Sequence, residues 1–427
     1  MTSAAIPASS LAAALDDTIA GLADAVIAWR RDLHANPELG NREFRTAAVV
    51  ADHLRALNFD EVRTGVAHTG VVGLLKGGLP GPVVALRADM DALPVTEEVD
   101  VPFASKVRGT WNGQEVGVMH ACGHDCHVAI LMGVAQALAM HRAQLRGSVK
   151  FIFQPAEETP PEGEDGGAKM IVAEGALENP VPRAIFGLHV TSFLPTGVIG
   201  YRPGPTMASS DKLKIDVHGS QTHGAAPWKG VDPIVTAAQV VLGLQTVVSR
   251  TIDLTEEPAV VTIGAINGGV RENIIPDRVE MRGTIRTFNE DMRDAIHERV
   301  KTLAEAIGTG NRATCRVCIT KSYPVTVNDP ALTEAMAPTL ARVAGDGQAR
   351  VVPKVTGSED FSFFQRVVPG LFIFLGVTEP GRDPRTAAPN HSPRFKVDED
   401  GLMLGVRALT HLACDYLEAP AGSAPGR

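Results

Sequence analysis

The chain has few cysteines and few aromatic residues for its length. Only five of its 427 residues are cysteine, and 5% are aromatic. An odd number of cysteines in a long chain argues against a disulfide framework. The sequence therefore predicts reduced thiols.

Strongly basic stretches and long apolar runs are also missing. The net charge is −9 and the sequence pI is near 5.8. We find no apolar run close to the roughly 20 residues that span a bilayer, and no basic region followed by an apolar core at the N-terminus. We therefore expect a cytoplasmic protein that binds neither nucleic acid nor membranes.

What the chain does have is the composition of folded domains. Hydrophobic residues make up 44% and charged residues 21% of it, and its length favours two or three domains. The apolar spacing over residues 15–33 predicts one amphipathic helix, and residues 46–57 predict a second.

Short apolar runs rich in Val, Ile and Phe follow these helices. They predict buried strands at residues 71–75, 83–86, 149–153, 184–188 and 371–375. Helical segments at residues 127–139 and 169–174 lie between them. This alternation predicts an α/β domain with a mixed, largely parallel sheet and helices on both faces.

A different pattern begins near residue 208. It predicts, in order, a strand, a long helix, two strands and a second helix, at residues 212–218, 232–250, 259–266, 279–287 and 292–307. This order suits a smaller α+β domain with an antiparallel sheet. We predict a catalytic domain from residues 1–207 and 321–427, with the insert at residues 208–320.

Acidic and imidazole side chains follow three of the predicted strands. Asp89 and Asp91 end the strand at residues 83–86, Glu157 and Glu158 follow residues 149–153, and His189 follows residues 184–188. Ligands in open α/β sheets bind at the carboxyl ends of strands. We therefore expect these side chains to converge on one edge.

The stretch MHACGHDCH, residues 119–127, joins this edge at the start of a helix. Cys122 and His124 are two residues apart and can reach one metal centre from a loop. A structural zinc site needs a second Cys/His pair nearby, and none follows. The alternative, buried thiols beside hydrogen-bonded histidines, is disfavoured by the density of ligand types.

A redox role is also disfavoured. Cys122 and Cys126 do not form a Cys-x-x-Cys motif. Cys315 and Cys318 do, but they lie in a predicted strand, where their thiols point to opposite faces. We interpret that pair as core filling.

Glu157 and Glu158 are neighbours, so both cannot face one ion in the same way. One can bind a metal while the other acts on a water whose pKa the metal lowers to about 7. The alternative is a solvated acidic surface. It is disfavoured because the pair directly follows an apolar strand and a proline.

These motifs carry a resemblance. MHACGHDCH, QPAEE, GLHV and PNHSP, in this order over nearly the whole chain, resemble the amidohydrolase branch of the aminoacylase and carboxypeptidase metallopeptidase family. This branch includes hippurate hydrolases and auxin-conjugate hydrolases. RRDLHANPELGNREF, HGSQTHGAAPWKGVDPI and GSEDFSFF also resemble it.

The resemblance implies a centre with two divalent metal ions and Glu157 as general base. Asp91 would lie outside the ligand set and orient a metal-bound imidazole. Zn²⁺ is favoured, while Mn²⁺, Co²⁺ and Ni²⁺ also suit these donors. The ligands it implies are Cys122, His124, Glu158, His189 and His391.

The resemblance also assigns roles to the insert. It implies a homodimer or higher homo-oligomer formed through this domain, which closes over the substrate. His223 would reach the partner subunit's active site and support the oxyanion. Asn273 and Arg286 would hold the substrate carboxylate, a task that suits the guanidinium fork of Arg286.

One departure from the family pattern concerns specificity. Family members run from the Glu pair almost directly into GGAK, whereas here residues Thr159–Asp165 add two prolines and several acids. We expect this loop to narrow the acyl pocket or to favour a cationic group.

We therefore predict a metal-dependent amidohydrolase that cleaves N-acyl amino acids to a carboxylic acid and a free amino acid through a metal-activated water. The alternative is a metallo-carboxypeptidase or dipeptidase acting on small peptides. A third interpretation, a metal-storage or regulatory protein, is disfavoured because a storage site has no use for Glu157.

Overall fold

The computed structural model describes residues 10–158 and 160–419, which divide into two compact units. Unit 1 contains the chain up to Gly204, Asn328–Pro353 and the chain from Phe363 onward. Unit 2 contains Pro205–Val327 and Lys354–Ser362. The prediction placed the insert at residues 208–320 and did not foresee that the chain enters unit 2 a second time.

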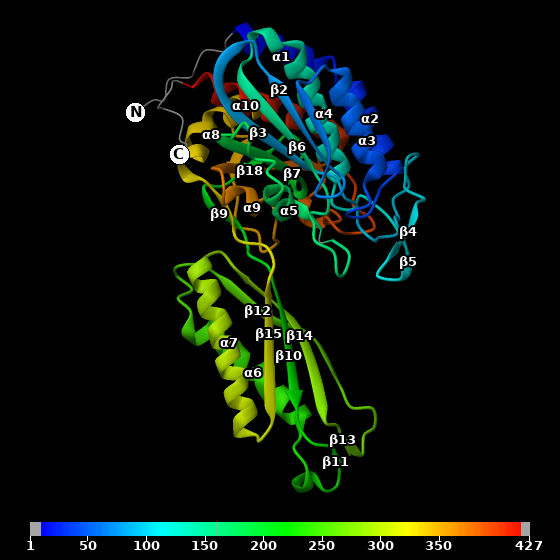
Figure 1. Ribbon diagram of the computed structural model, residues 1–427, viewed down its shortest axis with the longest axis vertical. Helices are drawn as coiled ribbons and strands as arrows, with labels where there is room; N and C mark the ends of the chain where they lie inside the picture. Colours follow the sequence, from blue (N-terminus) through cyan, green and yellow to red (C-terminus); the bar gives the residue numbers. More distant parts are fainter. Residues whose placement is uncertain (1–9, 159, 420–427) are drawn as a thin grey trace. The chain divides into compact units, whose positions relative to one another are not determined.

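Unit 1 is built on an eight-stranded sheet in the order β1-β2-β6-β3-β7-β18-β8-β17. Strands β6, β3, β7 and β18 are parallel, and β2 and β8 flank them antiparallel. The predicted mixed, largely parallel sheet is confirmed (Figure 1). The strands are β1 (Glu61–Val66), β2 (Gly70–Lys76), β3 (Leu79–Asp89), β6 (Arg146–Gln154), β7 (Ala184–Pro195), β8 (Ile199–Tyr201), β17 (Ala349–Val351) and β18 (Gly370–Thr378).

Helices pack on this sheet around one large apolar core. The central helix α4 (His124–Met140) contacts α10 (Leu402–Glu418), and both contact β3 and β7. The others are α1 (Ser10–Ala20), α2 (Ala23–Ala35), α3 (Phe44–Ala56), α5 (Gly167–Ala173), α8 (Pro330–Ala344) and α9 (Ser362–Gln365).

The single helix predicted over residues 15–33 is wrong, because the chain forms α1 and α2 with a break between them. The apolar spacing continues through the break and hides it. Gly21 lies there, and glycine is a poor helix former. The Leu22 N–H bonds the carbonyl of Ile19, which closes a tight turn.

Unit 2 has an antiparallel four-stranded sheet in the order β12-β14-β10-β15, with an apolar core of its own. Helices α6 and α7 pack against each other and against this sheet (Figure 1). A short ribbon of β11 and β13 lies at one end of the unit. The elements are β10 (Asp211–His218), β11 (Thr222–His223), α6 (Pro233–Thr251), β12 (Ala259–Gly268), β13 (Ile274–Ile275), β14 (Arg278–Thr287), α7 (Glu290–Gly310) and β15 (Thr314–Lys321).

Further two-stranded sheets join β4 (Arg108–Trp111) with β5 (Gln114–Gly117) and β9 (Gly204–Met207) with β16 (Thr326–Asn328). Cys315 is buried and Cys318 exposed on β15, which confirms that this Cys-x-x-Cys pair points to opposite faces. The interpretation of both thiols as core filling is wrong for Cys318, because only Cys315 lies in the core of unit 2. All five cysteines are free thiols.

One helix differs from the expectation that the chain has no apolar segment close to the length of a membrane span. Helix α6 meets that criterion by length and composition. Its buried residues recur at helical spacing and pack into the core of unit 2, which is the pattern of an amphipathic core helix.

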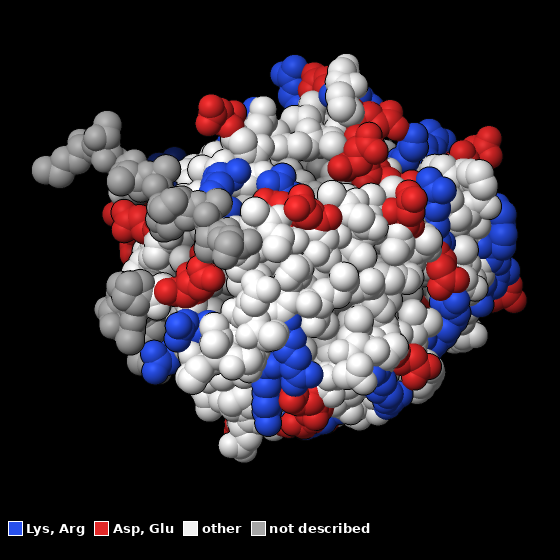
Figure 2. All heavy atoms as spheres, turned by 90° about the horizontal axis from the view of Figure 1, so that it is seen from above, with Lys and Arg blue, Asp and Glu red and all other residues white. Residues whose placement is uncertain are grey.

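The face drawn in Figure 2 shows acidic and basic side chains intermixed around a broad uncharged area. No continuous basic patch crosses the part of this face that the structure describes. The expectation that the protein has no nucleic-acid partner stays a prediction.

Candidate metal centre

Two neighbouring parallel strands bring the acidic residues together. Strand β3 ends at Asp89, and its register places Asp89 beside Gln154, the last residue of β6. Asp91 and the Glu157–Glu158 pair therefore leave the sheet side by side. This is the convergence expected at the carboxyl edge of a parallel sheet.

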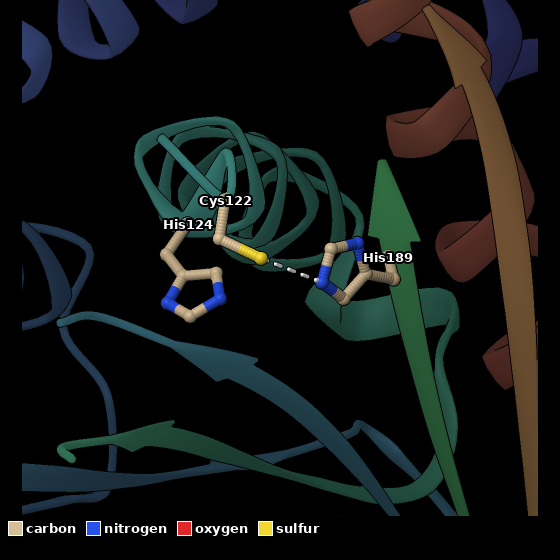
Figure 3. A group of neighbouring side chains, drawn as sticks. All are labelled: Cys122, His124 and His189. Carbon is tan, nitrogen blue, oxygen red and sulfur yellow. Dashed lines mark hydrogen bonds between the residues drawn. The ribbon is translucent and has the colours of Figure 1, made fainter. Parts of the chain in front are cut away.

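Cys122 and His124 meet these residues from the start of α4. Gly123 caps the helix in a left-handed conformation with φ of 91°, which lets the chain turn directly from Cys122 into the helix. An added Cβ at Gly123 would collide with the Val190 side chain. Figure 3 shows the Cys122 thiol directed towards His189, with His124 on the other side of it.

The Cys122 sulfur lies between two imidazoles. Its Sγ is 3.2 Å from His189 Nε2 and 3.2 Å from His391 Nε2. His391 Nε2 is also 2.9 Å from Glu158 Oε1. Cys122, Glu158, His189 and His391 come from four separate segments of the chain.

His189 occupies a different place from the one expected. The prediction put it at the end of its strand, but β7 continues to Pro195 and His189 lies inside it. Its imidazole reaches the centre because β7 continues beyond the residues paired with β3.

The predicted ligands form overlapping groups. In each group the ligand atoms lie within 4.8 Å of one another. The structure therefore brings together, within unit 1, every residue that the resemblance implied as a ligand or as the general base. The groups are Cys122 with His124 and His189, Cys122 with Glu158 and His391, and His124 with Glu157 and Glu158.

Asp91 holds several of these residues at once. Its backbone carbonyl lies 2.8 Å from His124 Nδ1, and its Oδ1 lies 3.3 Å from the same nitrogen and accepts the Glu157 N–H at 3.0 Å. Its Oδ2 accepts the Glu158 N–H at 3.0 Å. A single buried residue thus positions the His124 imidazole, mainly through its carbonyl, and the backbone of the acidic pair through its carboxylate.

Asp89 and His127 form another group with His124, but both are occupied by hydrogen bonds. His127 Nδ1 bonds Asp89, and His127 Nε2 accepts the Val190 N–H at 2.9 Å. Asp89 also pairs with the buried Arg87 at 2.7 Å. These hydrogen bonds indicate that Asp89 and His127 hold β3, β7 and α4 together.

Asp125 and Cys126 lie outside the ligand groups. Asp125 pairs with His34 at 2.8 Å and with Arg30 at 2.9 Å, which ties the start of α4 to α2. Cys126 is fully buried on α4, as expected of a core thiol.

The electrostatics of the centre reflect an excess of acidic groups. Burial raises the pKa of the Cys122 thiol well above its usual range, and the charges of Glu158 and Glu157 add to the shift. Burial alone would lower the pKa of His124, but the Asp89 carboxylate and the hydrogen bond to Asp91 raise it to about 10. Binding of a cation must release these protons, so metal affinity should rise with pH.

The donor set fits divalent cations. Thiolate, imidazole and carboxylate are ligands that zinc, cobalt, nickel and, for carboxylates, manganese accept. His124 Nε2 is buried and has no hydrogen-bond partner among residues 10–158 and 160–419. A buried polar atom without a partner is costly, and a bound cation would satisfy it.

Asn390 is a structural residue that the sequence reasoning missed. Its Nδ2 donates to the carbonyls of Cys122 and Val190 at 3.0 and 3.1 Å. The neighbouring His391 has a positive φ of 72° and bonds the Ala121 carbonyl through its N–H. Asn390 lies in the PNHSP motif, but the sequence predicted a role only for His391 in that motif.

The residues assigned to the insert fall into two separate places. His223 is exposed on β11, opposite Ile274 of β13, and the Asn273 carbonyl accepts the Gly224 N–H at 2.8 Å. His223 and Asn273 are therefore neighbours at the β11–β13 end of unit 2.

Arg286 lies towards the other end of β14, half-buried, with its Nη1 donating to Ser358 Oγ at 2.9 Å. Burial lowers its pKa from the ordinary value. Strand β14 begins at Arg278, close to β13, and eight residues of strand span about 26 Å. Unit 2 therefore separates Arg286 from Asn273, although both were predicted to hold one substrate carboxylate, and from His223, which was predicted to reach the partner subunit's active site.

The added loop after Glu158 is tied to the start of α3. The Glu164 carboxylate accepts hydrogen bonds from two nitrogens of the Arg42 guanidinium and from Asn41 Nδ2 at 3.1 Å. These hydrogen bonds lower the pKa of Glu164 to about 2. Thr159, the first residue of the loop, lies outside the described residues. The charge of Glu164 is paired within unit 1, whereas Glu162 and Asp165 are exposed, and the expected effect of the loop on specificity stays a prediction.

Comparisons with known proteins agree with this site. The model of peptidase family M20/M25/M40 matches residues 85–415. The chain belongs to this family. It is a hydrolase of amide or peptide bonds in the amidohydrolase branch, so the resemblance found from the sequence is confirmed.

Two relatives differ in the activity that their names give. Thermostable carboxypeptidase 2 of Saccharolobus solfataricus is 41% identical over 404 residues, 94% of this chain and 98% of that protein. N-acetylcysteine deacetylase of Bacillus subtilis is 38% identical over 393 residues, 92% of this chain and 97% of that protein.

The crystal structure of Bacillus subtilis YXEP, a dinuclear metal-binding peptidase of the M20 family, is similar to the present chain, with a TM-score of 0.77 and 35% sequence identity. The match covers 94% of this chain and 100% of that one.

Replacing Asp91 by alanine should weaken zinc binding by about 10- to 100-fold, because it removes the carboxylate that accepts the Glu157 and Glu158 N–H groups and lies beside His124, although the carbonyl of residue 91 still bonds His124. Competition with a chelator measures the affinity. Asp52→Ala is the control, since Asp52 is exposed on α3 and forms a surface ion pair with Arg55. Equal affinity of the two variants would show that Asp91 does not shape the centre.

Proposed function

We propose that the protein is a metal-dependent amidohydrolase that cleaves N-acyl amino acids to a carboxylic acid and a free amino acid. The observation that carries this proposal is the buried Glu157 beside His124 and Glu158. A site that only stores metal needs ligands, whereas Glu157 supplies a base in addition. The deacetylase relative supports cleavage of an acyl group from an amino acid.

We propose that the centre holds two divalent ions, by analogy with the dinuclear metal binding of the YXEP protein. Cys122 lies in two of the overlapping groups, once with His124 and His189 and once with Glu158 and His391. These five residues would hold the ions. When bound, the ions would act as Lewis acids towards the amide carbonyl and lower the pKa of a water molecule.

Glu157 would act as the general base. It would take a proton from the attacking water and deliver it to the leaving amine, which a carboxylate within hydrogen-bond reach can do. Asp91 fixes the backbone N–H of Glu157 at 3.0 Å and thereby its direction. Glu157 is 5% exposed, which limits competing water.

The second candidate function is a carboxypeptidase or dipeptidase using the same centre. It is favoured by the 41% identity to a thermostable carboxypeptidase. The two functions differ in the group on the acyl side of the cleaved bond. A panel of N-acetyl amino acids, N-benzoyl amino acids and dipeptides distinguishes them.

We also propose that the protein forms a homodimer through unit 2. Strand β12 is an edge strand, and uncovered apolar edges favour association. The separation of Arg286 from His223 and Asn273 in unit 2 also supports the proposal that His223 serves the partner subunit's centre. Exposed apolar side chains surround this edge and lie along α6, namely Ile234, Val235, Leu242, Val260 and Ile266.

Replacing Glu157 by glutamine should lower kcat by about three orders of magnitude, because an amide cannot accept the proton. Metal content should stay near two ions per subunit by elemental analysis. Glu115→Gln on the exposed β5 is the matched control. Turnover close to that of the control would remove Glu157 from the mechanism.

Mixing Glu157→Gln and His223→Ala subunits should restore about a quarter of the wild-type activity, because random pairing in a twofold dimer rebuilds one intact centre in half of the dimers. Mixtures of Glu157→Gln with Cys122→Ala should stay inactive, since both residues lie in unit 1. A His223→Ala mixture no better than that control would contradict sharing between subunits.

A further inference from the structure

Three consecutive backbone N–H groups at the centre each donate to a buried carboxylate. Ala156 donates to Glu43 Oε1 at 2.9 Å, and Glu157 and Glu158 donate to the two oxygens of Asp91 at 3.0 Å each. The Glu157 and Glu158 N–H groups converge on one carboxylate, as successive N–H groups do in an anion-binding nest, while the Ala156 N–H binds a second carboxylate. Two carboxylates of the protein itself, Glu43 and Asp91, therefore hold this stretch of backbone.

Ala156 has an unusual backbone conformation. Its φ is 52°, in the left-handed region that residues other than glycine seldom adopt. Such a conformation persists only where the surroundings impose it. The backbone is also confined by packing, because Cβ atoms added at Gly40 and Gly166 would lie 3.3 and 3.2 Å from Ala156.

Glu43 is well placed to impose this conformation. It is fully buried at the start of α3, and its second oxygen accepts the hydroxyl of Thr69 in the turn between β1 and β2. Its carboxyl group therefore joins three segments: the start of α3, the β1–β2 turn and the loop after β6. The two donors to Glu43, the Ala156 N–H and the Thr69 hydroxyl, both belong to residues outside the candidate ligand set.

The surroundings also favour a neutral Glu43. Burial and the nearby Asp91 charge raise the pKa of Glu43 to about 8. A glutamine amide has nearly the same shape as a protonated carboxyl group and retains an acceptor oxygen for the Ala156 N–H. Glutamine is therefore a conservative replacement, whereas alanine removes the acceptor.

We propose that Glu43 is a positioning residue of the metal centre. By holding the Ala156 N–H, it fixes the left-handed turn directly before Glu157 and Glu158 and so sets the direction of both carboxylates. Changing the dihedral angles of Ala156 would swing both side chains away from His124 and Cys122. This inference rests on the proposed function for its kinetic consequence, but not for its effect on metal binding.

The test compares Glu43→Ala with Glu43→Gln in the full chain. We expect Glu43→Ala to lower kcat by about 100-fold with a smaller change in KM, since displacement of catalytic groups by about 1 Å has effects of this size. Zinc affinity, measured with a competing chelator, should fall by about tenfold. Glu43→Gln should recover most of both losses.

Glu38→Ala is the matched control. Glu38 accepts the backbone N–H groups of Arg45 and Thr46 near the same helix start, away from the loop after β6. It should keep the wild-type zinc affinity and kcat. If Glu43→Ala and Glu38→Ala lower both quantities equally, or if Glu43→Gln is as impaired as Glu43→Ala, the proposal is overturned.

Two further measurements keep the outcomes distinct. If Glu43→Ala fails to fold, Thr69→Val removes the donor to Glu43, and kcat should fall about fivefold, as for one lost hydrogen bond. An unchanged kcat in that variant contradicts the proposal. If the wild type cleaves nothing in the substrate panel, the proposed function fails, while the zinc affinities of the Glu43 variants still decide the role of Glu43.

Discussion

Negative charge gathered at one edge of the sheet is the constraint on which the rest of the structure depends. Asp89, Asp91, Glu157 and Glu158 are all packed within a largely buried region together with the Cys122 thiol. Buried carboxylates of like sign repel one another and are costly to desolvate unless cations or hydrogen-bond donors compensate. The surrounding structure supplies part of this compensation, and bound divalent ions would supply the remainder.

Different groups of the protein compensate the charges of different carboxylates. Arg87 and His127 bond Asp89, while backbone N–H groups bond Asp91. The side chains left to face one another are those with good metal donors. His124 Nε2 is buried without a hydrogen-bond partner in the described part of the chain, with Asp89 Oδ2 3.7 Å away, and a bound cation would satisfy it.

Much of unit 1 could be predicted from the sequence because the informative signals are local. A run of apolar residues followed by an acid marks the end of β3 and of β6, and parallel strands bring such ends together. The MHACGHDCH stretch located the start of α4 only approximately, because the predicted helix began at residue 127 and α4 begins at His124. The break between α1 and α2 was missed because the apolar spacing on both sides is continuous.

The site residues that the sequence did not reveal depend instead on contacts between distant segments. Glu43 and Ala156 are 113 positions apart, and Asn390 bonds a carbonyl 268 positions away. A single Glu or Asn gives no local pattern that reveals such a partner.

The most direct test of the dinuclear centre is zinc X-ray absorption spectroscopy of the metal-loaded protein. We predict sulfur from Cys122 at about 2.3 Å from zinc and a second metal at about 3.5–4 Å. Both signals should be lost or strongly reduced in Cys122→Ala. Isolated zinc with only nitrogen and oxygen neighbours would contradict the proposed centre.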